Sequence, residues 1–368
     1  MGNQVFDLGL ILFNFINIGV CVSCAQALGN GNRRMARRIV HMALGLNIVW
    51  GAIISMGVFF CSGIIVDLMQ VPEEILESSH TYLMSFLPEA LCLCSAQILR
   101  AYECTRDSMY MAILINIITV IGNALFLFGL FGVPKLGVEG VAISTVIGRT
   151  VVVGFFIVLI VKRTKVRIIP RFMFVIKKKI LTHILNIGLP GAGENLSWHS
   201  QYMFMTAVIA SLGAIPLATH GIYFQMCMIL FLFSASIGMG TEILVAHYAG
   251  AMKLDLAYKQ LMHSVKLGML ITACIAVTIP MFSGEMAIKM FTDSKAVLAM
   301  ATPLFMLSVF MEPGRILNII IINSLRAVGD TKFPVIMAVI SMWCISVPLG
   351  CFLALYMDLG LLGVWIGF

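Results

Sequence analysis

Long apolar stretches alternate with short polar connections along this chain of 368 residues. A helix needs about 20 apolar residues to cross the hydrocarbon core of a bilayer, and ten stretches reach about that length. We therefore predict an all-α polytopic membrane protein with ten transmembrane helices. The predicted helices cover residues 4–28, 39–66, 79–99, 109–131, 138–161, 181–212, 216–245, 261–283, 296–325 and 333–356.

The composition agrees with this pattern. Hydrophobic residues make up 60% of the chain and charged residues only 11%, whereas roughly 25% of the residues of a soluble domain are charged. A large soluble catalytic domain and a disordered chain are therefore excluded. The net charge of +7 does not indicate a nucleic-acid partner, because the basic residues lie between predicted membrane helices.

The basic residues mark one side of the membrane. Most of the 24 Lys and Arg residues occupy every second connection, and the positive-inside rule makes these connections cytoplasmic. The first of the other connections is acidic, with Glu73, Glu74 and Glu77. This alternation supports the helix count and predicts a multi-pass protein of the cell membrane with Met1 outside. The cytoplasmic set comprises Arg33, Arg34, Arg37, Arg38, Arg100, Arg106, the cluster from Lys162 to Lys179, Lys253, Lys259, Arg326 and Lys332.

The chain also contains an internal repeat. Three short motifs of the first half recur in the same order in the second half, displaced by 221, 226 and 223 residues. The pattern indicates two pseudo-symmetric bundles in parallel orientation, as in transporters that rock two halves about a central site. The matching segments are Ala25–Gly29 with Ala246–Gly250, Leu99–Ala101 with Leu325–Ala327, and Leu136–Val141 with Leu359–Val364.

The repeat divides the chain into an amino-terminal lobe (1–161), a basic cytoplasmic linker (162–180) and a carboxy-terminal lobe (181–368). The second half has a helix at 181–212 before its copy of the first predicted helix, and the first half continues after its third motif into a further helix. Completing the symmetry gives twelve helices. We expect the chain to carry ten of them and to lack the first and the last.

Several motifs resemble those of the multidrug and toxic compound extrusion (MATE) family. They are the loop Gln26–Gly31 with the basic residues after it, the segment Leu325–Pro334, the two Leu-Gly-x-x-Gly-Val elements, and Gly188–Asn195. The resemblance covers essentially the whole chain. It implies a two-lobed antiporter that expels organic, often cationic, compounds in exchange for sodium ions or protons. The first helix, which supplies an acidic cation-site residue in many members, is one that we expect to be missing.

The resemblance also sets the expected partners. We expect small organic cations as substrates, sodium ions or protons as coupling ions, no other cofactor, membrane lipids around the protein, and a monomer. Three other readings stay open: a lipid-linked oligosaccharide flippase of the same architecture, a membrane enzyme, and an inactive fragment of a transporter. A flippase would need surplus intramembrane Arg or Lys for a pyrophosphate. No HExxH or other catalytic motif supports an enzyme.

Glu194 is the strongest candidate for a substrate-binding carboxylate. An ionisable group at membrane depth costs on the order of 3 kcal/mol, so such residues point to function. At helical spacing Glu194 shares a face with Trp198 and Gln201, and Asn195 lies on the neighbouring stripe. A carboxylate beside an aromatic ring suits a large organic cation, and Glu194 can also hold a sodium ion. The alternative is a structural hydrogen bond to a neighbouring helix.

Three further residues complete the candidate set. Glu312 and Arg315 flank Pro313 three positions apart, so they can neutralise each other on one helical face. They are either a structural pair or a gate at which an incoming cation replaces Arg315. Glu89 follows Pro88 and aligns within a few residues of this pair in the repeat. Glu242 lies near a cytoplasmic end, where we expect it to reach water.

Overall fold

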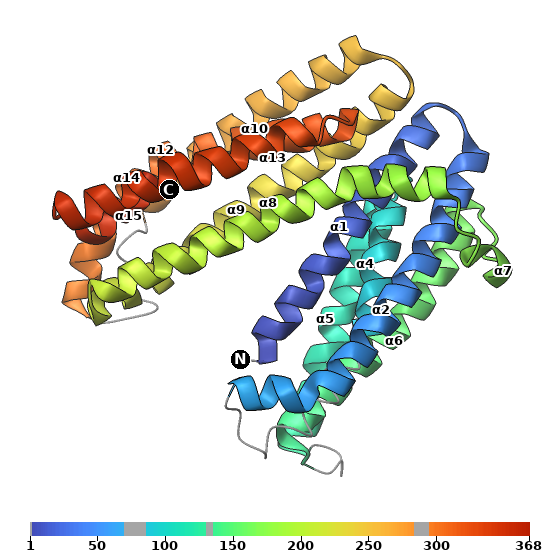
Figure 1. Cartoon of the computed structure of the whole chain (residues 1–368), viewed down its shortest axis with the longest axis horizontal. Coiled ribbons are helices and arrows are strands. Elements are labelled where there is room, and N and C mark those ends of the chain that lie inside the picture. Colours follow the sequence, from blue (N-terminus) through green and yellow to red (C-terminus); the bar gives the residue numbers. More distant parts are fainter. Residues whose placement is uncertain (1, 70–85, 130–134, 283–293) are drawn as a thin grey trace. The chain divides into compact units, whose positions relative to one another are not determined.

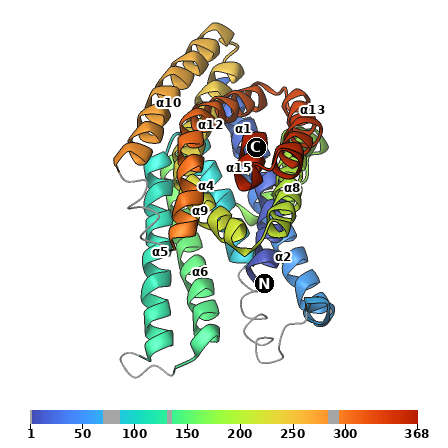
Figure 2. The same cartoon turned by 90° about the vertical axis from the view of Figure 1, so that its left-hand side faces the viewer.

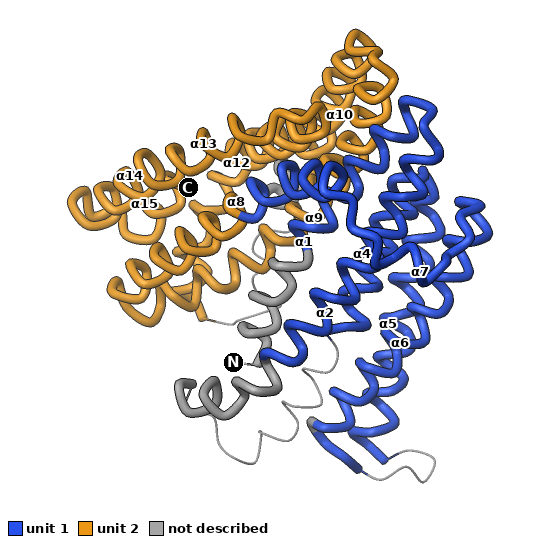
Figure 3. The backbone as a smooth tube through the Cα atoms, turned by 45° about the vertical axis from the view of Figure 1, so that its right-hand side comes forward, with its two compact units in different colours: residues 1–192 blue, residues 193–368 orange. Residues whose placement is uncertain are grey.

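A computed structural model describes residues 2–69, 86–129, 135–282 and 294–368. These residues form helices joined by turns (Figure 1). They divide into two compact units, residues 1–192 and 193–368 (Figure 3). The boundary lies inside one helix, two residues after Pro190 and beyond the predicted linker.

Unit 1 is a helical bundle. In it, α1 packs against α2 and α4, α4 packs against α6, and α6 packs against α5, while α7 lies on α2. Its elements are α1 (Gly2–Gly29), α2 (Arg33–Met69), α4 (Phe86–Ala101), α5 (Thr105–Phe128), α6 (Gly137–Thr164), α7 (Pro170–Met173) and the first part of α8 (Lys178–Ser211).

Unit 2 is built around the packing of α9 against α12 and α10. A helical run after α12 contains Pro348, which has no N–H to donate, and the backbone forms π-helical segments on both sides of it. After the end of α8, the elements are α9 (Ala214–Gly250), α10 (Leu254–Phe282), α12 (Lys295–Val328), α13 (Lys332–Ile340), η3 (Ser341–Ser346), α14 (Val347–Cys351), η4 (Phe352–Tyr356) and α15 (Gly360–Gly367).

The core of unit 2 centres on two aromatic residues. Tyr223 and Trp365 are fully or almost fully buried, and their rings meet edge to face at 4.6 Å. The Tyr223 hydroxyl donates a hydrogen bond of 2.9 Å to the carbonyl of Leu304. Because a buried tyrosine needs a partner for its hydroxyl, this bond fixes α9 against α12.

The predicted helices agree with those of the structure. Within the described residues, nine of the ten predicted stretches coincide with one helix each, and the tenth, 333–356, lies on the run from α13 to η4. Among the described residues, six helices are long and apolar enough to cross a membrane. The acidic connection with Glu73, Glu74 and Glu77 falls outside the described residues.

The repeated motifs share backbone conformation as well as sequence. Gly31, after α1, and Met252, after α9, are displaced by 221 residues and have φ of 69° and 58°. In both turns the next N–H donates to the carbonyl five residues earlier at 2.9 Å. Glu103 and Gly329, displaced by 226 residues, have φ of 62° and 100°, with equivalent bonds of 2.9 and 3.0 Å. These are Schellman-type helix ends.

The two copies of the third motif also share their backbone conformation. Gly137 precedes the body of α6 and Gly360 precedes that of α15, and their φ values are 55° and 54°. Both are left-handed conformations that glycine adopts without steric cost. Three pairs of equivalent turns with the same unusual backbone confirm that the two bundles are related by the internal repeat.

The outer surface of the bundle is apolar. Within α5, Ser108 is the buried residue, whereas Val120 and Phe128 are 67% and 68% exposed. Figure 2 shows α5 at the edge of unit 1 beside α6. Exposed apolar area of this extent is unusual for a soluble protein, and it is the surface that a lipid-facing helix presents.

Candidate functional site

Glu194, the strongest candidate, is held in an ion pair. It lies in α8, which stays α-helical through Pro190. The Arg326 Nη2 atom donates to Glu194 Oε2 at 3.0 Å, and the two side chains are 9% and 19% exposed, respectively. Arg326 belongs to the last turn of α12, and its Nη1 atom also donates to Asn323 at 3.3 Å. The pair keeps two charges compensated where water is scarce.

The predicted face of α8 is present beside Glu194. Trp198 is partly buried and stacks on Tyr202 with the ring centroids 5.7 Å apart. Gln201 is buried, and its Nε2 atom donates to Ser346 Oγ at 2.7 Å. Asn195 is exposed. Binding of substrate by Trp198, Gln201 and Asn195 stays a prediction.

Glu312 and Arg315 form the intrahelical pair that their spacing predicts. The Arg315 Nη1 atom lies 3.1 Å from Glu312 Oε1. Glu312 is fully buried and Arg315 is 24% exposed at the side chain. The contact is close enough for an ion pair, although its angles are not those of a hydrogen bond. Whether this pair is structural or a gate stays open.

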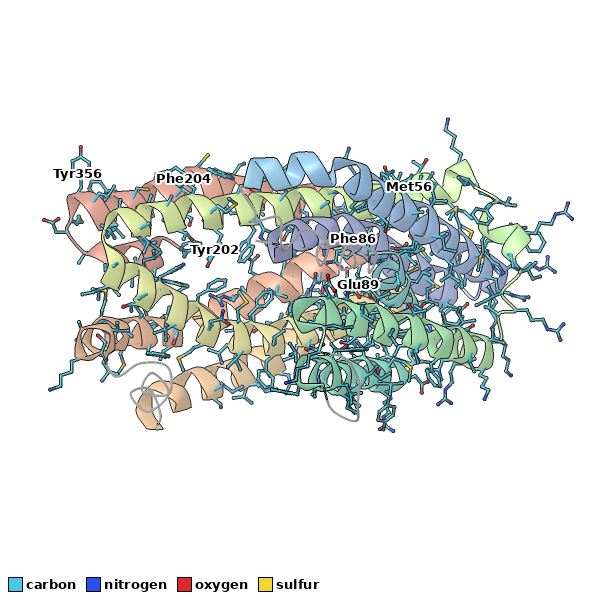
Figure 4. The ribbon with its side chains drawn as sticks, turned by 90° about the horizontal axis from the view of Figure 1, so that it is seen from below. Met56, Phe86, Glu89, Tyr202, Phe204 and Tyr356 are labelled. Atoms are coloured by element: carbon cyan, nitrogen blue, oxygen red, sulfur yellow. The ribbon has the colours of Figure 1, made fainter. Side chains whose placement is uncertain are left out.

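Glu89 is paired as well. Its Oε2 atom lies 2.8 Å from Arg149 Nε in an ion pair, and both side chains are 15% exposed. This pair joins α4 to α6 within unit 1. Figure 4 labels Glu89 one turn from Phe86 on the same helix, and it shows Tyr202 in unit 2 and the outward-pointing Tyr356. All three predicted carboxylates therefore face an arginine.

Glu242 is the residue that sequence reasoning missed. We predicted that it reaches water, and this is wrong, because Glu242 is only 7% exposed. Its Oε1 atom has no hydrogen-bond partner among the described residues. Arg326 and Glu194 are the charged groups that act on it electrostatically. Because α9 continues for eight residues beyond Glu242, the side chain lies in the helix body, which packs against α12, and not at a solvent-exposed helix end.

The buried charges of the described residues are arranged as ion pairs. No group of three or more His, Cys, Asp and Glu side chains in the described part of the chain could hold a metal ion. Glu89, Glu194 and Glu312 are each matched with a guanidinium group. Repeat-related bundles of apolar helices with charges in their interior are typical of multi-pass membrane transporters.

Comparisons with known proteins give the family. The MatE family matches residues 1–125 and 190–352, and the chain therefore belongs to the MATE family of membrane transporters. It is 37% identical to the uncharacterized transporter YisQ of Bacillus subtilis strain 168, covering 100% of this chain and 82% of YisQ. It is 26% identical to a probable multidrug resistance protein NorM of Thermotoga maritima, covering 100% and 80%.

Solved structures agree on the fold. The outward-facing conformation of a multidrug resistance MATE family transporter superposes with a TM-score of 0.89 at 19% identity, covering 99% of this chain and 82% of that one. The comparisons confirm the family resemblance, the all-α two-lobed fold, the location in a cell membrane and transport in place of catalysis. They do not bear on the site residues.

Proposed function

We propose that the protein is a secondary antiporter that expels organic cations in exchange for sodium ions or protons by alternating access. The observation that carries the proposal is the Glu194–Arg326 pair, in which a mostly buried carboxylate is bound to an internal cation at 3.0 Å. A cationic substrate can take the place of the guanidinium at Glu194. Trp198 and Tyr202 offer aromatic surface for such a substrate.

The arginine pairings favour this function over lipid-linked oligosaccharide transport. A flippase needs unpaired cations for a pyrophosphate. Arg149, Arg315 and Arg326 each lie within ion-pair distance of a carboxylate. Each of these arginines is thus already matched by a carboxylate, which suits a cationic substrate better than a pyrophosphate.

The proposal is tested by the Glu194→Gln variant, which keeps the side-chain shape and removes the charge. Efflux of ethidium from cells should be lost at equal membrane expression. The matched control is Asp255→Asn, an exposed acid in the first turn of α10, which should transport normally. Glu194→Gln alone leaves the guanidinium of Arg326 without its carboxylate, which could destabilise the fold. The double variant Glu194→Gln/Arg326→Gln removes this charge as well, so a loss of efflux in it is not caused by an uncompensated buried cation. Normal efflux in either Glu194 variant would contradict the proposal.

The linker offers a site for membrane lipids. Phe172, Phe174 and Ile176 are 53%, 60% and 60% exposed, and they are flanked by the exposed basic residues Arg171 and Lys177. Exposed apolar side chains flanked by cations are typical of a segment that lies on an anionic leaflet. We expect photo-crosslinking to anionic lipids to label this segment, and Phe172→Ser/Phe174→Ser to reduce the labelling.

A further inference from the structure

Glu242 is a buried acid that forms no ion pair of its own with the described residues. It lies in α9 between the buried Thr241 and Ile243, and its Oε1 atom makes no hydrogen bond among the described residues. A buried ionised carboxylate in this position is costly unless a cation or several donors compensate it. Glu242 therefore needs a proton or a positive partner.

Among the described residues, the guanidinium that acts on Glu242 is that of Arg326, and it is already engaged. Its Nη2 atom donates to Glu194 and its Nη1 atom to Asn323. The charge of one guanidinium thus acts on two carboxylates, and it is hydrogen-bonded to Glu194. If both were ionised, the cluster would carry one uncompensated negative charge in a buried place. One added positive charge restores neutrality, and that charge is either a metal ion or a proton.

A proton fits this place better than a metal ion. A metal ion would need several oxygen ligands around it, and the guanidinium beside Glu242 would repel it. A proton on Oε1 turns the unpartnered acceptor into a neutral hydroxyl and leaves the Glu194–Arg326 pair undisturbed. The protonated form of Glu242 is therefore the one that suits the observed arrangement.

The internal repeat shows that this acid belongs to unit 2 alone. The residue equivalent to Arg326 in unit 1 is Arg100, and the residue equivalent to Glu242 is Cys21. Cys21 is buried and lies near Arg100. Unit 1 thus places a thiol near the arginine where unit 2 places a carboxyl, so this position of the repeat does not require an acid.

We propose that Glu242 is the proton-binding site of the exchange and that Arg326 moves between the two acids. This rests on the proposed function. At the start Glu194 is paired with Arg326 and Glu242 is protonated. When a monovalent organic cation binds Glu194, Arg326 is released and pairs with Glu242. The O–H bond of Glu242 breaks, its electron pair stays on the carboxylate and the proton passes to water. One cation is bound for each proton released, and the cluster stays neutral throughout.

The test measures proton release when ethidium binds to the purified full chain. In weakly buffered solution with a pH dye, about one proton should be released for each ethidium bound. By linkage, the affinity for ethidium should then rise about tenfold per pH unit while Glu242 is protonated. Replacing choline chloride by sodium chloride at constant pH should not change the affinity.

The variants separate this inference from the proposed function. Glu242→Gln and Glu242→Cys, the latter copying unit 1, should bind ethidium more weakly and with no dependence on pH. Asp255→Asn should behave as the wild type. Proton release by the wild type and by the Glu242 variants alike, or competition by sodium, would overturn the role of Glu242. Failure of the wild type to bind ethidium at all would instead overturn both this role and the proposed substrate class.

Discussion

Gly188 of α8 lies directly against the backbone carbonyl of Phe15 in α1, and a Cβ at residue 188 would overlap that oxygen. Gly19 makes the reciprocal approach to the carbonyl of Ile184. The two helices therefore meet backbone to backbone within unit 1, as small residues allow in membranes. Gly188, which flanks Pro190, serves close packing.

We expect Gly188→Ala and Gly19→Ala to destabilise the protein by about 1–3 kcal/mol, since the obstacle is backbone and the helices must separate. The melting temperature of the protein in detergent measures the effect. Gly154→Ala in α6 is the control, because no atom lies within 4 Å of the added Cβ. It should be neutral or stabilising by up to about 1 kcal/mol. Equal melting temperatures for all three variants would refute the contact.

The left-handed turns before α6 and α15 give a second prediction. Gly137→Ala and Gly360→Ala should each cost about 1–2 kcal/mol through backbone strain alone, because nothing lies within 4 Å of either added Cβ. Asparagine tolerates this conformation better, so Gly360→Asn should melt between wild type and Gly360→Ala. An alanine variant as stable as the asparagine variant would show that the strain is absent.

Cys104 provides a test of topology and of its own chemistry. It follows α4 outside the helices, and burial, followed by the nearby Asp107, raises the pKa of its thiol. The neutral thiol therefore persists above its usual pH range, and labelling by a membrane-impermeant maleimide should be slow at pH 7 and speed up as the pH rises. Labelling should occur from the cytoplasmic side and disappear in Cys104→Ser.

Asp107→Asn should speed up this labelling at pH 7. It removes the negative charge near the thiol, and it releases Arg163, whose Nε atom lies 2.6 Å from Asp107 Oδ2. Both changes lower the pKa of Cys104. Labelling from outside would contradict the cytoplasmic location of Cys104. A slower rate in Asp107→Asn would contradict the effect of Asp107 on the pKa of Cys104.

His41 of α2 is predicted to hold the linker. Its Nδ1 atom lies 2.7 Å from the Arg37 carbonyl, and its Nε2 atom lies 3.1 Å from the Arg167 carbonyl and accepts from the Ile169 N–H at 3.2 Å. His41→Leu should release the segment and accelerate tryptic cleavage at Arg171, followed by mass spectrometry. His263→Leu, an exposed histidine of α10, is the control. Unchanged cleavage would show that His41 does not hold the segment.

Breaking the Glu312–Arg315 pair should be costly. Glu312→Gln leaves a cation without its partner, and the expected loss of stability is about 3–5 kcal/mol. The neutral double variant Glu312→Gln/Arg315→Gln should regain most of the melting temperature. If it regains stability but not ethidium efflux, the pair is a gate; recovery of both makes it structural.

Much of the fold could be predicted because its helices and its repeat can be recognised directly from the order of residues along the chain. The ten helices follow from apolar length, and the repeat follows from three motifs with nearly constant displacement. The π-helical turns around Pro348 and the short α7 have no such signal, since backbone geometry near a proline depends on packing. The division into units at 192/193 falls inside α8, where composition does not change.

The candidate site could be predicted only in part. The Glu312–Arg315 pair follows from spacing within one helix. Arg326 was assigned to a cytoplasmic connection by its charge, although α12 extends to include it, so its pairing with Glu194 was missed. Glu242 was placed by its distance from a helix end, but α9 is longer than a single bilayer crossing requires. The alignment of Glu242 with Cys21 in the repeat was the available signal.

The left-handed turns that end the repeated helices have a consequence for how the sequence can change. In one pair glycine stands only in the first copy, at Gly31, and methionine holds the same backbone in the second, at Met252. In another the order is reversed, with Glu103 first and Gly329 second. Duplication thus preserved the shape of the chain while letting the residue drift. A residue that one half uses at such a turn can therefore be tried at the equivalent position of the other half. Replacing Met252 or Glu103 by the glycine of the equivalent turn should stabilise the protein and keep its backbone conformation.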